Sequence, residues 1–209
     1  MKTLVISYLP RRERSRTKKL QDYAVKNLKG EIEYLDLVKE LPSFFLEESL
    51  SAYYKRNYAK QKLDDHEKKA IEQMDKLTNQ FKSADNIVLA YPMYNMSMPG
   101  IVKTYFDSIL LKGETWDIGE KGYVGLLKEK NAIVITTSAG IYEGDFSNWD
   151  HSTNFVNHLF QFMGFKLVDV IHTGGMNGNP DHEKLIMDKS KLKIEESLKE
   201  LNKTIEITI

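Results

Sequence analysis

The chain has 209 residues, of which 41% are hydrophobic, and this length and composition suit one α/β domain with an ordinary core over residues 1–209. Lysine plus arginine and aspartate plus glutamate number 30 each, so the chain lacks the basic excess that is typical of a nucleic-acid partner. No cysteine is present, which excludes disulfides, thiolate metal sites, iron–sulfur clusters and cysteine nucleophiles.

The chain begins with a short apolar, β-branched run at residues 3–7, which predicts a buried strand. This run is too short for the apolar region of a signal peptide, and arginines follow it in place of a cleavage site. No apolar run approaches the roughly 20 residues that a membrane-spanning helix needs. We therefore expect a cytoplasmic protein with no membrane partner.

Strand and helix patterns alternate along the rest of the chain. Apolar residues at helical spacing predict five helices, at residues 15–28, 64–83, 99–111, 153–163 and 181–202. Short apolar or alternating runs predict four further strands, at residues 31–35, 86–91, 132–136 and 166–172, and a β tail at residues 204–209. Residues 42–63 are aromatic and irregular with room for a short helix, and the four glycines of residues 113–127 predict a loop or hairpin.

Five short strands, each followed by a helix, predict a parallel sheet with helices on both faces, which is a three-layer sandwich. Right-handed crossovers favour the strand order 2-1-3-4-5. Ligands of such sheets bind beyond the carboxyl ends of the strands, at the switch point between strands 1 and 3. The candidate site therefore lies in three loops, at residues 8–16, 91–99 and 137–151.

The first of these loops leads into a helix at Ser15, Arg16 and Thr17. Unpaired amides at a helix start favour an anion, and two hydroxyls with an arginine add donors for a phosphate monoester. Plain N-capping by Ser15, with solvated arginines beside it, is the simpler interpretation of this loop alone. Neither GxGxxG nor GxxxxGKS/T occurs, which argues against a dinucleotide site and against NTP hydrolysis but leaves a mononucleotide phosphate open.

The second loop reads Pro92-Met93-Tyr94-Asn95-Met96, followed by a proline at residue 99 and a helix that contains KTYFD at residues 103–107. This block resembles the FMN-dependent NADH-azoreductases, which are also quinone reductases and carry PMYN, a proline and a KxYFD helix. The resemblance extends over most of the chain and implies a flavodoxin-like fold. It places these five loop residues at the flavin edge, where the Asn95 amide would both donate and accept. Taken without the family, the loop is a turn with core-packing methionine and tyrosine.

The third loop, within residues 135–144, stands where the family has ITSRGGI. The resemblance assigns cofactor contacts to Thr137, Ser138, Ala139 and Gly140. Serine replaces the family arginine at residue 138, and alanine replaces one glycine at residue 139, where close approach of the backbone to a flavin favours glycine. A histidine that often follows in the family is Tyr142 here, which makes Tyr142 the single candidate for a proton donor from the protein.

Aromatic side chains outside the three loops have two interpretations each. Trp116 takes the place of an aromatic that the family sets beside the flavin, which implies substrate binding, and the alternative is a packed loop aromatic. The aromatic residues of 42–63 form either a local mini-core or, as the family implies, a contact wall between two copies in a homodimer. The five histidines include no i,i+3 or i,i+4 pair and no HExxH motif, so we expect no metal site.

The resemblance implies one non-covalent FMN per chain and electrons from NADH or NADPH, which reduce a quinone or azo substrate by hydride transfer in a ping-pong cycle. The first alternative is an electron carrier of the flavodoxin kind, but such carriers tend to be strongly acidic and this chain has zero net charge. The second alternative is a flavin-binding protein without catalysis. The two departures in the third loop keep it open.

Overall fold

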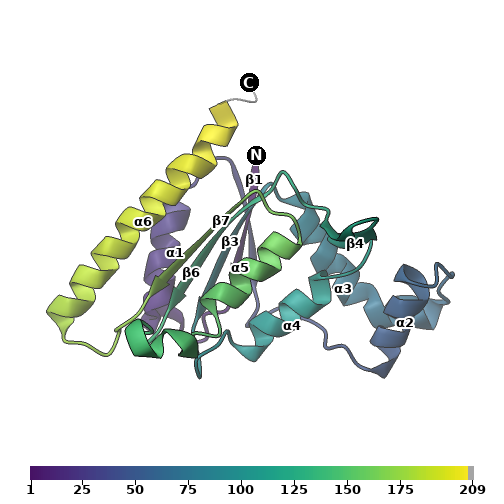
Figure 1. Cartoon of the computed structure of the whole chain (residues 1–209), viewed down its shortest axis with the longest axis horizontal. Coiled ribbons are helices and arrows are strands. Elements are labelled where there is room, and N and C mark those ends of the chain that lie inside the picture. The colour runs from purple at the N-terminus through teal and green to yellow at the C-terminus, as the bar shows by residue number, and fades with distance from the viewer. Residues whose placement is uncertain (207–209) are drawn as a thin grey trace.

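The computed structural model describes the backbone of residues 1–206 and the side chains of residues 1–202, and its centre is a parallel sheet (Figure 1). The sheet has five strands in the order β2-β1-β3-β6-β7. Their bounds are β1 Lys2–Ser7, β2 Glu31–Asp36, β3 Asn86–Pro92, β6 Asn131–Thr137 and β7 Leu167–Thr173. Counted within this sheet alone, the order is the predicted 2-1-3-4-5.

The register brings the carboxyl ends of the central strands to one edge of the sheet. Pro92 at the end of β3 pairs with Thr137 at the end of β6. Thr137 pairs in turn with Thr173, the last residue of β7. Loops that leave these strands therefore start side by side, which is the condition for a shared site.

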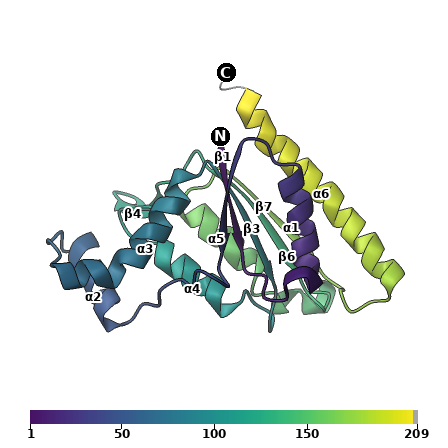
Figure 2. The same ribbon diagram turned by 180° about the vertical axis from the view of Figure 1, so that it is seen from behind.

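Helices cover both faces of the sheet (Figures 1 and 2). One face carries α1 (Arg16–Lys26) and α6 (Pro180–Glu206), and the other carries α3 (Asp65–Ser83), α4 (Gly100–Ile109) and α5 (Thr153–Phe162). Side chains alternate between the faces along each strand, so every apolar strand contributes side chains to two separate cores. Core residues from the sheet on the α1 face include Val5, Val88 and Ile133, and those on the α3 face include Leu4, Leu89 and Val134.

Two sequence predictions outside the sheet need refinement. The irregular segment contains α2 (Glu47–Asn57), which is longer than the short helix for which the sequence left room. Residues 113–127 contain the antiparallel hairpin of β4 (Trp116–Gly119) and β5 (Gly122–Gly125), as one of the two predicted alternatives has it.

The predicted β tail is wrong for residues 204–206, because α6 continues to Glu206. Extending an existing helix adds one hydrogen bond per residue without a new nucleus, and this outweighs the β preference of an isolated threonine or isoleucine. The rest of the predicted tail, residues 207–209, lies outside the described residues.

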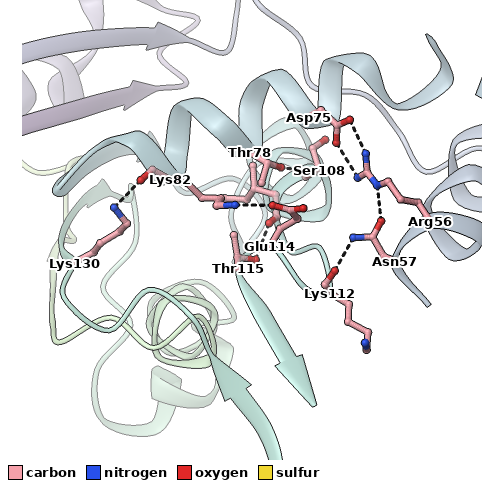
Figure 3. A network of polar contacts seen from close by, with 11 residues as sticks. Arg56, Asn57, Asp75, Thr78, Lys82, Ser108, Lys112, Glu114, Thr115 and Lys130 are labelled. Carbon is pink, nitrogen blue, oxygen red and sulfur yellow. Dashed lines mark hydrogen bonds and ion pairs between the residues drawn. The ribbon is translucent and has the colours of Figure 1, made fainter. Parts of the chain in front are cut away.

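A polar network fastens α2 and the segment before the hairpin to α3 (Figure 3). Arg56 of α2 donates to both carboxylate oxygens of Asp75 in α3, at 2.6 and 2.8 Å. The buried Asn57 amide donates to the carbonyl oxygen of Lys112 at 2.6 Å, and its own oxygen accepts from Arg56 at 2.9 Å. These contacts hold the α2 excursion against α3 and against the segment before the hairpin.

Candidate functional site

A cavity of about 190 Å³ opens at the carboxyl edge of the sheet, between the loops that follow β1, β3 and β6. Most residues predicted for the site line it, namely Ser15, Arg16, Thr17, Pro92, Met93, Tyr94, Thr137, Ser138 and Ala139. The topology alone brings these residues together, because they come from three distant parts of the chain.

The first loop presents the amino end of α1 to the cavity. Ser15 has an extended backbone, and its Oγ accepts a hydrogen bond from the Lys18 amide at 3.2 Å, so the capping interpretation is confirmed. Within the part of the chain that the structure describes, no group accepts from the amides of Arg16 and Thr17. These two amides, together with the side chain of Arg11 on the cavity wall, form a site of positive potential.

Two side-chain contacts fix this helix start in place. Thr17 Oγ1 lies 2.7 Å from Thr137 Oγ1, and both side chains are buried, so the first loop is tied to the third. Arg16 donates to Glu183 of α6 at 2.7 Å. The hydrogen bond from Arg16 holds the pKa of the Glu183 carboxyl below its usual range.

The second loop is a tight turn with a strained centre. Tyr94 and Ser97 exchange backbone hydrogen bonds at 3.0 and 3.1 Å, and between them Asn95 and Met96 have φ values of 49° and 66°. Asparagine adopts this left-handed region readily, whereas methionine does so at a cost. Neither Asn95 nor Met96 lines the cavity; Asn95 is exposed and Met96 is half-buried, directly after Tyr94 of the cavity wall.

The third loop offers free backbone donors. Within residues 1–206, no hydrogen-bond acceptor faces the amides of Ala139 and Gly140, and both residues are exposed. Alanine fits at residue 139 because this position is exposed. A Cβ added to Gly140 would meet nothing closer than the Tyr142 ring at 3.8 Å, so Gly140 also faces open space.

Tyr142 and Trp116 are not part of the cavity wall. Tyr142 lies beyond Gly140, with its ring centroid 6.2 Å from that of His172. Trp116 begins the hairpin, packs 5.2 Å from Phe162 between ring centroids, and donates its indole N–H to the Leu110 carbonyl at 3.1 Å. In the single chain Trp116 is therefore a packed aromatic residue.

A fourth loop, after β7, also closes the cavity and was not predicted from the sequence. It contributes Met176 and Asn177, while Pro10 and Arg11 of the first loop complete the wall. Its conformation depends on glycine, because a Cβ at Gly174 would lie 2.9 Å from the Gly140 carbonyl oxygen and Gly175 has a φ of 80°. This close approach explains the consecutive glycines, and their place after the last strand was the signal for a further wall of the site.

Behind the third loop lie His172 and Asp150, which were not predicted from the sequence as site residues. His172 Nε2 is 2.7 Å from Ser138 Oγ, and His172 Nδ1 is 4.0 Å from an Asp150 oxygen. Burial lowers the pKa of the His172 imidazole, against the opposing effect of Asp150. The site thus has a titratable group within hydrogen-bond distance of its wall.

Two kinds of comparison place these features in a family. The model of a family described as "Flavodoxin-like fold" matches residues 1–198. A relative from Coprothermobacter proteolyticus, an FMN-dependent NADH:quinone oxidoreductase, is 35% identical over 186 residues, which cover 86% of this chain and 89% of that protein.

Solved structures agree with the sequence comparisons. An azoreductase from Bacillus anthracis (strain Sterne) superposes with a TM-score of 0.86 at 26% identity, over 97% of this chain and 99% of the other. An FMN-dependent NADH-azoreductase from Bacillus anthracis (strain Ames Ancestor), solved in complex with FMN, has a TM-score of 0.84 at 27% identity, over 96% and 99%. The chain therefore belongs to the family of flavodoxin-like fold that includes these FMN-dependent oxidoreductases.

Proposed function

We propose that this protein binds one FMN per chain without covalent attachment and uses NADH or NADPH to reduce quinones and azo compounds, two electrons at a time. The observation that carries the proposal is the meeting of the α1 amino end with the loops after β3 and β6 in one cavity. In this family, relatives and solved neighbours carry FMN in their names.

The donor set of the cavity fits the phosphate of a mononucleotide. The free amides of Arg16 and Thr17 and the guanidinium of Arg11 would bind the phosphate oxygens, with the Ser15 and Thr17 hydroxyls beside them. The Arg16 side chain is already paired with Glu183, so its backbone amide is the more available donor.

The remainder of the cavity fits a flat ring with polar edges. Pro92, Met93 and Met176 supply an apolar wall, and the free amides of Ala139 and Gly140 supply donors at its edge. Asn95 and Met96, with Tyr94, would bound the outer side of the ring. When bound, FMN supplies the hydride chemistry, and these residues hold it in place and exclude water from one face.

We further propose that two copies pair as a homodimer that completes the site. The cavity of about 190 Å³ is smaller than the about 300–1,000 Å³ usual for ligand pockets, so one chain encloses only part of a flavin. In the segment after the third loop, Phe146 and Trp149 are 59% and 52% exposed, and Phe44 near α2 is 60% exposed. Exposed aromatics of this kind are typical of protein–protein interfaces.

Several finer expectations belong to the same proposal. Trp116 would contact substrate only where pairing of two chains brings the hairpin to a site, and Tyr142 would donate a proton only from outside the cavity wall.

We also propose a single three-layer domain over residues 1–209 that acts in the cytoplasm, with no nucleic-acid or membrane partner. Among residues 1–206, no helix has both the length and the apolar character of a membrane span.

A turnover assay distinguishes the proposed oxidoreductase from an electron carrier and from a flavin-binding protein without catalysis. The purified protein is mixed with FMN, NADH and a soluble quinone, and the loss of nicotinamide absorbance is followed. We expect rapid NADH oxidation that requires both FMN and quinone. A protein that binds FMN but does not oxidise NADH would instead be an electron carrier or a flavin-binding protein, and bound FAD or absent FMN affinity would contradict the proposal outright.

A further inference from the structure

A second hollow lies next to the cavity, between α1 and α6 on one face of the sheet (Figures 1 and 2). The volume of this α1–α6 groove is about 420 Å³, within the roughly 300–1,000 Å³ usual for ligand pockets. Among the residues that the structure describes, Arg16 is the one that lines both the cavity and the groove. The chain also passes from one to the other, since Asn177 lines the cavity and Gly178 lines the groove. The two spaces are therefore neighbours, with Arg16 at their boundary.

The lining of the α1–α6 groove suits a group that is both anionic and partly apolar. Its charged residues are Arg16, Lys19, Glu183, Lys184, Asp188 and Lys191. Lys191 pairs with Asp188 at 2.8 Å, and Arg16 pairs with Glu183 at 2.7 Å. Lys19 and Lys184 are left as an excess of positive charge, and the buried Met187 adds apolar surface between the helices.

An ion pair stands between the groove and the cavity. Arg16, the first residue of α1, donates to a carboxylate oxygen of Glu183 in the first turn of α6. The two side chains are 34% and 23% exposed. The hydrogen bond from Arg16 outweighs burial and holds the pKa of the Glu183 carboxyl below its usual range, so the pair is ionised at neutral pH. The pair therefore joins the starts of two helices across the boundary.

The proposed function places the FMN phosphate at this same boundary. The free amides of Arg16 and Thr17 would bind its oxygens, and the Arg16 side chain extends from there to Glu183. FMN ends at this phosphate, whereas in FAD the phosphate carries an adenylate, which consists of a second phosphate, a ribose and an adenine. The nearest hollow that could hold the adenylate is the α1–α6 groove, and the ion pair lies in the way.

We propose that the Arg16–Glu183 ion pair makes the flavin site selective for FMN over FAD, because it closes the cavity against a groove that would otherwise hold the adenylate of FAD. The inference rests on the proposed function, in which the cavity holds the flavin. In the groove, lysine ammonium groups would bind the second phosphate, and Met187 would contact the adenine. Glu183 is a specificity-determining residue in this account and does not touch FMN, since it lines the groove and not the cavity.

A change of charge alone predicts the opposite selectivity. Removing the Glu183 carboxylate frees the Arg16 guanidinium next to the first phosphate. The monoester phosphate of FMN carries more negative charge than either phosphate of FAD, so the freed guanidinium by itself favours FMN. A shift toward FAD in a Glu183 variant therefore reports the opening of the groove.

Fluorescence titration of the full chain with FMN and with FAD gives two dissociation constants, and their ratio is the readout. In the unmodified protein FMN should bind more tightly than FAD. Glu183→Ala should shift the ratio at least about tenfold toward FAD, because it removes both the ion pair and the side chain that closes the groove. Partly exposed ion pairs contribute little to stability, so this variant should remain folded, which a thermal melt verifies.

Two further variants locate the adenylate and control for the substitution. Glu196→Ala makes the same change on the same helix, in a different hollow beside β7, and should leave the ratio unchanged. Adding Lys19→Gln and Lys184→Gln to Glu183→Ala should remove most of the shift, because the second phosphate loses its cations.

Three results would overturn the selectivity role of the ion pair and leave the proposed function intact. These are equal affinities for FMN and FAD in the unmodified protein, an unchanged ratio in Glu183→Ala with FMN still bound, and a shift toward FAD that persists in full without the two lysines. Absence of FMN affinity in the unmodified protein would overturn both the inference and the proposed function.

Discussion

Asn95 has a structural role in its turn. This role has to be distinguished from its predicted role at the flavin. Its φ of 49° lies in the left-handed region, which asparagine and glycine tolerate and leucine does not. Loss of affinity in a leucine variant would therefore mix strain with the loss of an amide.

Glycine and leucine at residue 95 distinguish the two roles. Asn95→Gly retains the turn and removes the amide, so FMN affinity should fall by about ten- to hundredfold, as expected for unpaired polar groups costing about 1–3 kcal/mol. The thermal midpoint should hardly change. Asn95→Leu should lose similar affinity and also lower the midpoint, because a left-handed leucine is strained by about 1–3 kcal/mol. Wild-type FMN affinity in Asn95→Gly, measured by fluorescence titration, would mean that Asn95 shapes the turn only.

The hydroxyls at the start of α1 should distinguish FMN from riboflavin. Replacing Ser15 and Thr17 with alanine removes two donors to a charged acceptor, each contributing about 1.5–3 kcal/mol, so FMN affinity should fall at least about tenfold. Riboflavin, which lacks the phosphate, should bind nearly as before. Loss of the Ser15 cap also costs about 1 kcal/mol of stability, which thermal unfolding of the Ser15→Ala single variant would measure. Equal losses for both ligands would show that these hydroxyls do not touch phosphate.

At the scale of single residues, the sequence predicted many of the residues that line the cavity but not how their side chains are arranged. Ser15 and Thr17 were identifiable because their hydroxyls stand at a predicted helix start, and Thr137 and Ser138 because their loop resembles a family motif. The positive φ of Met96 and the contact between Ser138 and His172 were not, because both depend on how distant segments meet in space.

At the scale of elements, Asp150 stabilises the start of α5 with a pH dependence that can be predicted. It accepts three hydrogen bonds from Ser152 and Thr153, and its pKa is lowered in the folded protein. A lowered folded pKa contributes stability above the unfolded value of about 3.9, and this contribution is lost as pH falls through the folded value.

Asp150→Asn should therefore lower the thermal midpoint at neutral pH and reduce the loss of stability below about pH 4. Thermal melts across the acid range measure both effects. Asp65→Asn makes the same change at a side chain that is 99% exposed and serves as the control. Parallel acid profiles for Asp150→Asn and the unmodified protein would show that Asp150 carries no such linkage.

Elements with a strong apolar period were predictable from sequence, and weakly patterned ones were not. The runs in β3 and β6 are buried on both faces, and the spacing along α3 marks one apolar stripe. The α2 helix was obscured because its faces are aromatic and charged rather than cleanly divided. At residues 204–206, alternation suggested a strand, but continuation of α6 prevailed.

At the scale of the whole molecule, the topology and the place of the site followed from the order of elements, whereas pairing of chains did not. Aromatic residues are exposed after β6 and near α2, and a two-fold pairing would bury the same surface on both chains. Light scattering at micromolar concentration should give twice the chain mass of 24.2 kDa. A monomer with full quinone reductase activity would contradict the proposed homodimer.

The central claim is that the cavity holds FMN as a carrier of two electrons from NADH to a quinone, and an anaerobic titration of the FMN-bound protein tests it most directly. One equivalent of NADH should bleach the flavin absorbance completely, and one equivalent of a soluble quinone, added afterwards, should restore it with formation of hydroquinone. A flavin that NADH does not bleach, or that a quinone does not restore after bleaching, would contradict the account.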